Sequence, residues 1–270
     1  MKIEVIMSAY NNVRDLELVL DGYLNQLDND FSLCIADDGS THEVADLIQK
    51  YSQTNLTIRH IWHEDLGFRR AAILNKAIKS STADHIIFTD SDCIPSPHFV
   101  ADHRKFASTE HYTVGIRVYL KPYLSNCFRN GSLTPSRLFN GFWLLSQSLK
   151  ERVSKPEQAL RYPDFILPII NKLKPDLTIF GSNIAMSLDS LLKVNGLDED
   201  FEGWGYEDTD LLWRLEQIGL TSQGSLGRCC QYHLDHKENA PNPHAFNLFK
   251  QKQEDGKIYC DNGINKKASD

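Results

Sequence analysis

Short apolar segments alternate with helical patterns along the first hundred residues, and this alternation limits the fold more than any other feature. Strand-like runs fall at residues 3–7, 31–36, 56–61 and 85–89. Apolar residues recur in steps of three and four at 13–27, and shorter helices are expected near 43–51 and 71–79. Strands that alternate with helices in this way predict an α/β fold with a doubly wound, mostly parallel sheet and right-handed crossovers.

The composition bounds the class of protein. The 270 residues are 41% hydrophobic and 24% charged, which is typical of a soluble globular chain with one large domain or two small ones. A formal net charge of −7 argues against a generic nucleic-acid binder. The chain shows no signal-peptide pattern after Met1, no run of about 18 apolar residues and no C-x-x-C pair. We therefore expect a reduced, cytoplasmic protein.

Asp90 and Asp92 close the apolar run at 85–89, which has the composition of a buried parallel strand. Ligands of open α/β sheets bind beyond the carboxyl ends of the strands, so both side chains are expected at a binding edge. Two close carboxylates repel each other unless a cation joins them, and Mg²⁺ or Mn²⁺ at such oxygen ligands commonly holds substrate phosphates. A metal site for a diphosphate is one interpretation, and a strand-end turn with a helix cap is the other.

Two further acidic groups follow this pattern, one after the second strand and one at the start of a late helix: Asp37 and Asp38, and Glu207, Asp208 and Asp210. The helix dipole favours acidic residues in a first turn, so capping alone could explain the later group. Capping does not explain the preceding Gly203-Trp204-Gly205. Glycines let the backbone approach a ligand, and the indole offers a flat face to a sugar ring.

The second half of the chain is less regular. Its expected elements are a strand and two helices, at 114–119, 188–195 and 211–218. Gly196 stands where the glycine that ends a helix belongs, and the polar end from residue 250 is expected to fray. An apolar cluster at 139–145 is either a core-facing helix or a face that touches a membrane or a lipid-linked substrate.

Several short motifs occur in a fixed order. In the first half they are Val5-Ile6-Met7-Ser8-Ala9-Tyr10-Asn11, Ala36-Asp37-Asp38-Gly39-Ser40 and Thr89-Asp90-Ser91-Asp92. These resemble the nucleotide-binding half of the family-2 glycosyltransferases. In the second half they are Phe180-Gly181-Ser182-Asn183, Asn195-Gly196, the run 203–210, Arg214-Leu215, His233, Asn239-Ala240-Pro241-Asn242-Pro243 and Phe246. These resemble the carboxyl half of the β-1,4-galactosyltransferases and chondroitin-type polymerases.

The resemblance implies a GT-A fold with a Rossmann-like nucleotide-binding half. It implies a single domain, 1–270, with a nucleotide-sugar-binding half at 1–119, a variable insertion at 120–175, an acceptor and catalytic half at 176–249 and a polar tail at 250–270.

The resemblance also implies which residues bind the nucleotide sugar. Tyr10 would stack on or near the base, Asp38 would bind uracil and Asp90 would face the ribose. Ser8 and Ser91 belong to the same motifs and are assigned to the same site.

A divalent metal, Mn²⁺ or Mg²⁺, is implied with Asp92 and His233 as ligands. In the galactosyltransferases a methionine three residues before the histidine also ligates, and Cys230 stands in that place here. A thiolate would favour softer ions, so we leave Cys230 out of the predicted metal site. Many family-2 members also carry an arginine where this chain has Leu74, and we expect Arg69 or Arg70, one turn earlier, to supply the charge for the diphosphate.

The remaining assignments concern the transferred sugar and its acceptor. Trp204, Gly205 and Asn183 are expected to bind sugar. The resemblance makes Glu207 a sugar-holding residue and Asp208 the general base.

The sequence therefore predicts an inverting, metal-dependent glycosyltransferase that moves a hexose from a nucleotide sugar, UDP-linked or similar, to a saccharide hydroxyl. Surface polysaccharide or glycolipid synthesis of bacterial type is the expected setting, with peripheral contact at the inner face of a membrane left open. Two alternatives also stay open: a non-catalytic module that binds nucleotide sugar or glycan, and a nucleotidyltransferase. The latter usually has a loop with glycine and lysine or arginine after its first strand, and residues 8–12 contain none of these.

Overall fold

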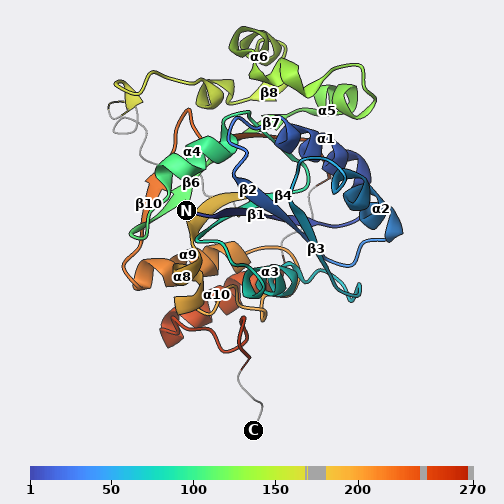
Figure 1. Cartoon of the computed structure of the whole chain (residues 1–270). Helices are drawn as coiled ribbons and strands as arrows, with labels where there is room; N and C mark the ends of the chain where they lie inside the picture. The colour runs from blue at the N-terminus through green and yellow to red at the C-terminus, as the bar shows by residue number, and fades with distance from the viewer. Residues whose placement is uncertain (168, 170–180, 238–241, 267–270) are drawn as a thin grey trace.

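The structure is a computed structural model that describes residues 1–167, 169, 181–237 and 242–266 (Figure 1). Its main sheet has seven strands in the order β10-β6-β9-β4-β1-β2-β3. They are β1 (Ile3–Ala9), β2 (Phe31–Asp37), β3 (Ile58–Trp62), β4 (His85–Asp90), β6 (His111–Val114), β9 (Asn183–Ser187) and β10 (Thr221–Gly224). Only β9 runs antiparallel to its neighbours, β4 and β6. The predicted α/β fold with a mostly parallel sheet is therefore confirmed.

The strand order reverses between β1 and β4. The chain runs outward from β1 to β2 and β3, and then returns to place β4 on the other side of β1. Open α/β sheets bind ligands at such a switch point, outside the carboxyl ends of the strands. The parallel register pairs Ser8, near the end of β1, with Asp90, the last residue of β4. Both strands therefore deliver a polar side chain to the same point.

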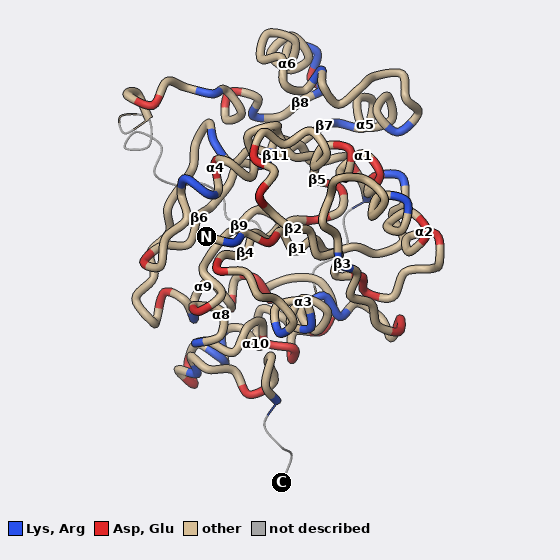
Figure 2. Tube along the Cα trace, in the orientation of Figure 1, with Lys and Arg blue, Asp and Glu red and all other residues tan. Residues whose placement is uncertain are grey.

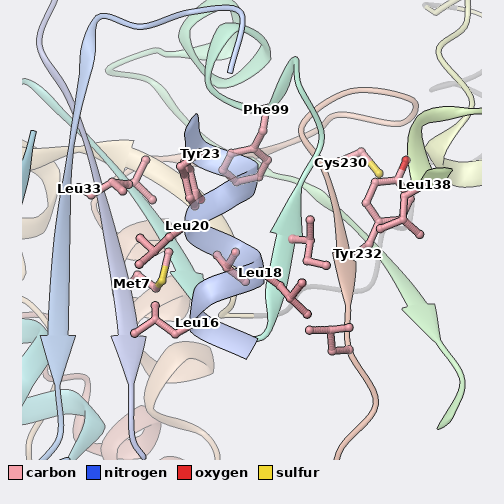
Figure 3. Close-up of a cluster of buried hydrophobic side chains, with 14 of the residues drawn as sticks. Met7, Leu16, Leu18, Leu20, Tyr23, Leu33, Phe99, Leu138, Cys230 and Tyr232 are labelled. Carbon is pink, nitrogen blue, oxygen red and sulfur yellow. The ribbon is translucent and has the colours of Figure 1, made fainter. Parts of the chain in front are cut away.

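Helices cover both faces of the sheet (Figure 1). They are α1 (Val13–Leu24), α2 (His42–Tyr51) and α4 (Phe99–Phe106) on one face, and α3 (Arg70–Lys79), α8 (Leu188–Lys193) and α9 (Glu207–Gln217) on the other, with α10 (Pro243–Asp255) beyond them. Successive strand residues point to opposite faces, so each face buries half of the apolar side chains. Met7 of β1 packs with Leu16, Leu20 and Tyr23 of α1 (Figure 3), whereas Ile6 joins the cluster under α3 and α9.

A second, four-stranded sheet brings the two halves of the chain together. Its order is β5-β11-β7-β8, with β5 (Cys93–Pro95), β11 (Cys230–His233), β7 (Ile116–Leu120) and β8 (Val153–Ser154). The antiparallel pairing of β11 with β5 sets His233 opposite Cys93, the residue after Asp92. The backbone N–H of Leu234 donates to the carbonyl oxygen of Asp92 at 2.9 Å. A segment from late in the chain is thus fixed next to Asp92.

Residues 121–160 form a helical arm on this second sheet. It contains α5 (Pro122–Arg129), α6 (Gly141–Ser148) and the 3₁₀ turns η1 (Pro135–Phe139) and η2 (Pro156–Ala159). The expected apolar cluster at 139–145 is divided: Leu144 is buried in the core, whereas Phe142 and Leu145 are exposed. Among the helices described, none has the length and apolar character needed to cross a membrane.

The single strand expected at 114–119 is wrong, because the chain changes sheets there. Strand β6 ends at Val114 and β7 begins at Ile116, with Gly115 between them. A Cβ on Gly115 would lie 2.0 Å from the side-chain oxygen of Asn183, so the crossing needs a residue without a side chain. The one-dimensional pattern could not show this, since the obstacle comes from a residue far along the chain.

Two other expectations are corrected. Helix α9 begins at Glu207, not at residue 211, and the acidic group Glu207, Asp208 and Asp210 stands in its first turn, as expected. The end of the chain does not fray up to residue 266, because Cys260 and Ile264 are buried. The side chain of Asn195 holds this end by donating to the carbonyl oxygen of Cys260 at 2.7 Å and accepting from the backbone N–H of Asn265 at 2.9 Å.

The C-terminal half depends on a buried ion pair within α9. The guanidinium of Arg214 is 1% exposed and donates to Asp210 at 2.8 Å and to the carbonyl oxygens of Val194 and Gly196 at 2.6 and 2.8 Å. Removing one partner of a buried pair leaves an uncompensated charge, which typically costs about 3–5 kcal/mol. We therefore expect Arg214→Met to lower the free energy of unfolding by about that amount in urea denaturation.

An exposed pair on α8 provides the matched control. Lys193 and Asp189 have side chains that are 61% and 71% exposed, and such pairs contribute at most about 1 kcal/mol. If Arg214→Met cost no more than Lys193→Met, the Arg214 network would not be what holds α9 in place.

Candidate active site

A cavity of about 380 Å³ opens at the carboxyl ends of β1 and β4. Both halves of the chain line it: Ser8, Ala9, Tyr10, Asn12, Asp38, Phe68, Arg70, Asp90, Ser91, Asp92, Arg117, Trp204, His233 and His236. Nine of the fourteen residues expected at the site are in this lining. The other five, Arg69, Asn183, Gly205, Glu207 and Asp208, lie outside it or behind it.

A hydrogen-bonded group of three residues occupies the switch point. The hydroxyl of Ser8 donates to the carboxylate of Asp90 at 2.6 Å, and the guanidinium of Arg70 donates to the same oxygen at 3.1 Å. Burial disfavours the charge on Arg70, but Asp90, Glu207 and Asp208 more than offset this and raise its pKa. Arg70 is therefore a permanent cation at the floor of the cavity.

The structure distinguishes between the two arginines considered for the diphosphate. Arg70 is the first residue of α3 and lines the main cavity. The guanidinium of Arg69 instead donates to the carbonyl oxygen of Glu64 at 2.5 Å, and Arg69 lines a separate cavity of about 160 Å³. Of these two, only Arg70 is positioned to meet a ligand in the main cavity.

Asp38 lies buried at the end of β2 and is held on both oxygens. One oxygen lies 2.5 Å from Nε2 of His63, and the other accepts the backbone N–H of Arg69 at 2.8 Å. A carboxylate has about four lone-pair positions, so Asp38 can still accept a hydrogen bond from a ligand. These two contacts fix its orientation toward the cavity.

The expected base-stacking residue, Tyr10, lies at the entrance. Its ring is 52% exposed, and its hydroxyl donates to Asp65 at 2.9 Å, which raises the pKa of Tyr10. An exposed ring beside Asp38 offers a flat apolar face to an aromatic base. Ser91 is buried below, where its backbone N–H donates to the carbonyl oxygen of Ser8 at 3.0 Å.

Three candidate metal ligands meet on the opposite wall. One ligand atom from each of Asp92, His233 and His236 lies within 4.8 Å of the other two. Nε2 of His236 is 3.0 Å and Nε2 of His233 is 3.6 Å from the same Asp92 oxygen, and the two nitrogens are 3.2 Å apart. A carboxylate with two imidazoles is a common ligand set for divalent transition metals. The residues present therefore fit a divalent cation.

The protonation of this group follows from its burial and its charges. Burial alone would raise the pKa of Asp92, but the hydrogen bond with His236 and the charges of both histidines lower it. The hydrogen bond to Asp92 raises the pKa of His236 to about 9, while burial lowers that of His233. Asp92 is thus ionised at neutral pH, which is the form that binds metal.

The sequence reasoning missed two residues of this wall. His236 follows His233 at a spacing of three, and a search for paired histidines around His233 could have found it. Arg117 comes from β7 and donates to Ser182 at 2.7 Å and to the hydroxyl of Tyr119 at 2.8 Å. No local motif marks Arg117, because only the pairing of β7 with β11 brings it to the cavity.

Cys230, which was considered as a further ligand, does not belong to the group of candidate metal ligands. Residues three apart on a strand point to opposite faces, so Cys230 and His233 of β11 diverge. Cys230 packs in the core near Leu138 and Tyr232 (Figure 3), and burial raises the pKa of its thiol to about 12.

The two acidic residues of the first turn of α9 differ in surroundings. Glu207 is 5% exposed, lies 3.5 Å from Arg70 and accepts the backbone N–H of Gly205 at 3.1 Å. Burial raises the pKa of Glu207, although Arg70 opposes the shift. Asp208 is partly exposed and accepts the backbone N–H of Gly181 at 2.7 Å. A Cβ on Gly181 would lie 2.4 Å from that carboxylate, so the approach requires glycine.

The three residues expected to bind sugar differ in their exposure and hydrogen bonding. Trp204 lines the cavity with 41% of its surface exposed, and Gly205 behind it has φ +113°, which glycine adopts readily. Asn183 is buried and uses its amide internally: it accepts from His103 and donates to the carbonyl oxygens of Ile116 and Cys229. Direct sugar contact by Asn183 is therefore wrong, because its polar atoms hold the two sheets together. The motif residues Phe180 and 239–241 lie outside the described part of the chain.

Comparison with known sequences supports the resemblance. The model of glycosyl transferase family 2 matches residues 4–167, and the model described as the N-terminal domain of galactosyltransferase matches 170–237. Validoxylamine A glucosyltransferase of Streptomyces hygroscopicus subsp. jinggangensis is 26% identical over 261 residues, which cover 88% of this chain and 57% of that protein. Chondroitin synthase of Pasteurella multocida is 25% identical over 228 residues, covering 79% of this chain and 23% of that protein. The chain thus spans little more than half of the first relative.

Solved structures share the fold. TarS of S. aureus (1–349) in complex with UDP-GlcNAc superposes with a TM-score of 0.60 at 16% identity, covering 92% of this chain and 64% of that one. Mannosyltransferase PcManGT from Pyrobaculum calidifontis in complex with GDP-Man and Mn²⁺ gives 0.58 at 16% identity, covering 93% and 61%. The predicted GT-A fold is therefore confirmed.

The metal ligands can be tested by direct binding. We expect Asp92→Ala, His233→Ala and His236→Ala each to weaken Mn²⁺ binding at least about tenfold in isothermal titration calorimetry, since loss of even an outer-sphere partner commonly costs that much. His42→Ala is the control, because the side chain of His42 is 81% exposed on α2. Affinity unchanged in all three variants would exclude this wall as the metal site.

Proposed function

We propose a function on the basis that the chain belongs to glycosyl transferase family 2. The chain transfers a hexose from a nucleotide sugar to a saccharide hydroxyl. The transfer inverts the configuration at the anomeric carbon and uses a divalent metal. One observation carries the proposal. A single cavity at the switch point of the sheet brings together the exposed ring of Tyr10 and the carboxylate of Asp38, a buried arginine and a carboxylate-histidine group. A nucleoside diphosphate could use all three, and the indole of Trp204 in the same lining offers a place for an attached sugar.

The donor is proposed to lie across the ends of β1, β2 and β4. Tyr10 stacks on the base and Asp38 accepts the N3–H of uracil, which makes UDP the preferred nucleotide. Asp90 faces the ribose. The diphosphate then extends between the cationic Arg70 and the metal ligands, and the sugar lies toward Trp204. All five residues line the same cavity.

The metal is proposed to be Mn²⁺ in preference to Mg²⁺. Asp92, His233 and His236 would hold it, and two imidazoles among three ligands make Mg²⁺, which prefers oxygen, the weaker candidate. When bound, a divalent cation neutralises the charge that develops on a departing diphosphate. Arg70 acts on the same charge through its own guanidinium, held against Asp90 and Glu207.

The reaction is proposed to be a single displacement. The acceptor hydroxyl oxygen forms a bond to the anomeric carbon while the bond from that carbon to the diphosphate oxygen breaks. The hydroxyl proton passes to Asp208, and the electron pair of the broken bond stays on the diphosphate. Asp208 suits this role because it is partly exposed and oriented by the N–H of Gly181, whereas Glu207 is already paired with Arg70. We assign Glu207 to holding the sugar.

The acceptor is proposed to be a growing surface glycan or a lipid-linked saccharide, handled at the cytoplasmic side of a membrane. The names of the relatives, a glucosyltransferase and a chondroitin synthase, support a saccharide or saccharide-like acceptor. The exposed indole of Trp204 offers such a ring a flat face at the mouth of the cavity.

A donor screen tests the proposal. Purified chain is incubated with UDP-, GDP- and other nucleotide sugars, with and without Mn²⁺, and release of free nucleoside diphosphate is measured. We expect hydrolysis of a UDP-sugar that depends on Mn²⁺. Tight donor binding without turnover under any condition, with acceptor saccharides present, would favour a non-catalytic module, and release of pyrophosphate would indicate a nucleotidyltransferase.

The nucleotide pocket generates a separate prediction. We expect Asp38→Ala to weaken UDP binding roughly tenfold to a hundredfold in calorimetry, because it removes a hydrogen bond to a charged acceptor. Asp46→Ala, an exposed carboxylate on α2, is the control and should bind UDP like the wild type. Melting curves check that loss of the contacts to His63 and Arg69 has not unfolded the loop. Intact UDP affinity in folded Asp38→Ala would show that the base binds elsewhere.

The assignment of the general base is tested by two neighbouring variants. Asp208→Asn keeps an oxygen that can accept from Gly181, so the fold and donor affinity should stay close to wild type. General-base catalysis typically contributes about 10²–10⁴-fold, so kcat should fall by that much. Glu207→Gln removes a partner of Arg70 and should act mainly on KM for the donor. An inactive Glu207→Gln beside a nearly wild-type Asp208→Asn would reverse the two roles.

A further inference from the structure

Helix α6 turns an apolar face to solvent. Phe142 and Leu149 are each 89% exposed, and Leu145 is 38% exposed. These positions are i, i+3 and i+7, which lie on one side of a helix. The other side, with Leu144 and Gln147, is buried against the arm and the core. A helix at the surface of a globular domain normally turns its apolar side inward, so the outward face of α6 needs a partner.

The charge around α6 is opposite to that of the rest of the chain. Residues 120–162 carry seven basic and two acidic side chains, a net +5, in a chain whose formal net charge is −7. The basic residues are Lys121, Arg129, Arg137, Lys150, Arg152, Lys155 and Arg161, and the acidic ones are Glu151 and Glu157. Figure 2 shows the blue segments around α5, α6 and β8, where few red segments interrupt them.

Several of these cations are available to a partner. Arg129 and Arg161 are paired with Asp15 and Asp102. Lys121, Arg137, Lys150 and Lys155 are exposed and form no ion pair within the ranges that the structure covers. The guanidinium of Arg152 lies 3.9 Å over the exposed ring of Tyr123. The arm therefore carries both a small apolar patch and several unpaired basic groups, and the partner that fits it is both apolar and anionic.

We propose that α6 docks on an anionic lipid bilayer. Phe142, Leu145 and Leu149 enter the boundary between head groups and acyl chains, while Lys121 and Lys150 meet lipid phosphates. Apolar side chains on one helix face with cations beside them are the features of a helix that lies in a membrane interface. α6 lies at the outer end of the molecule, on the side opposite α10, so a flat surface can reach it (Figure 1).

A second copy of the chain fits this surface less well. Most homodimers are two-fold symmetric, so the same patch would face itself and bring two sets of basic side chains together. The patch also consists of three side chains on a helix of about two turns, whereas a stable protein interface usually buries about 1,200 Å² or more. Binding of α6 to a bilayer needs neither a donor nor turnover, so it can be tested separately from the proposed activity.

Vesicle flotation tests the docking surface. The full chain is mixed with phosphatidylcholine vesicles or with vesicles that also contain phosphatidylglycerol, and the bound fraction is measured at low and high salt. We expect binding to the anionic vesicles that weakens with salt. The double variant Phe142→Ser/Leu149→Ser should reduce partitioning into vesicles about tenfold or more. The double variant Lys121→Gln/Lys150→Gln should reduce it about fivefold for each lysine replaced.

Control variants on the far side of the sheet distinguish binding through this surface from nonspecific binding to vesicles. Leu192→Ser replaces another exposed leucine, on α8, and Lys79→Gln another exposed lysine, at the end of α3, and both should bind as the wild type does. Absence of binding to anionic vesicles would overturn the proposal, and so would binding that the α6 variants leave unchanged. Sedimentation showing a dimer that Phe142→Ser/Leu149→Ser dissociates, without vesicle binding, would assign the patch to a second copy instead.

Discussion

The pairing of β11 with β5 is the interaction on which the candidate site depends. Strand β5 starts immediately after Asp92, and β11 ends at His233, so their antiparallel register sets a late histidine beside an early carboxylate. The strand is fixed from a second direction by Gln231, whose buried amide accepts from Thr89 at 3.1 Å and donates to the carbonyl oxygen of Ser182 at 2.8 Å. A shift of β11 by one residue would turn His233 into the core and Tyr232 into the cavity. The grouping of the candidate metal ligands is thus a consequence of sheet register.

The charges around this cavity give a physical reason to expect that an anion binds there together with a cation. Asp38, Asp90 and Asp92 line it, and Arg70 and Arg117 are the arginines in the same lining. Arg70 already interacts with the carboxylates of Asp90 and Glu207, so part of its charge is balanced within the protein, whereas the hydroxyls that Arg117 contacts are neutral. A nucleoside diphosphate would bring further negative charge close to these three carboxylates, where repulsion between like charges is strong. A divalent ion at Asp92 would reverse the sign on that side of the cavity, which is the physical reason to expect donor and metal to bind cooperatively.

The sequence predicted the first half of the fold well because its signals are local. Apolar runs and helical spacing depend on neighbouring residues, and the strands and helices up to residue 90 occur where those patterns indicate them, within a few residues. The predictions that were wrong concern positions whose structure is set by contacts between distant segments. Gly115 breaks a strand because Asn183 stands against it, and Asn183 has no free polar atom for sugar because His103, Ile116 and Cys229 use them all. No periodicity or motif near these positions carries that information.

The same distinction applies to individual residues of the site. Asp90 and Asp92 could be placed from their position at the end of a strand, and His233 from its place in the family order. The choice between Arg69 and Arg70 could not be made, since both precede the helix expected at 71–79 and only the turn of the backbone directs one toward Asp90 and the other toward Glu64. His236 was not predicted, because it lies beyond β11 in a segment without regular structure. In such a segment the spacing of residues alone does not show which way a side chain points.

The helical arm is connected directly to the metal-binding wall, which gives the fold a reason to keep α5 and α6 together. The hydroxyl of Ser125 accepts the backbone N–H of Asp235 at 2.8 Å, and Arg129 donates to the carbonyl oxygen of Asp235 at 2.8 Å. Asp235 precedes His236, so α5 fixes the backbone that presents this ligand. Both contacts are short and partly buried, and Leu124 and Phe128 anchor the same helix in the core. If a bilayer binds α6, these contacts connect the docked arm with the backbone that precedes His236.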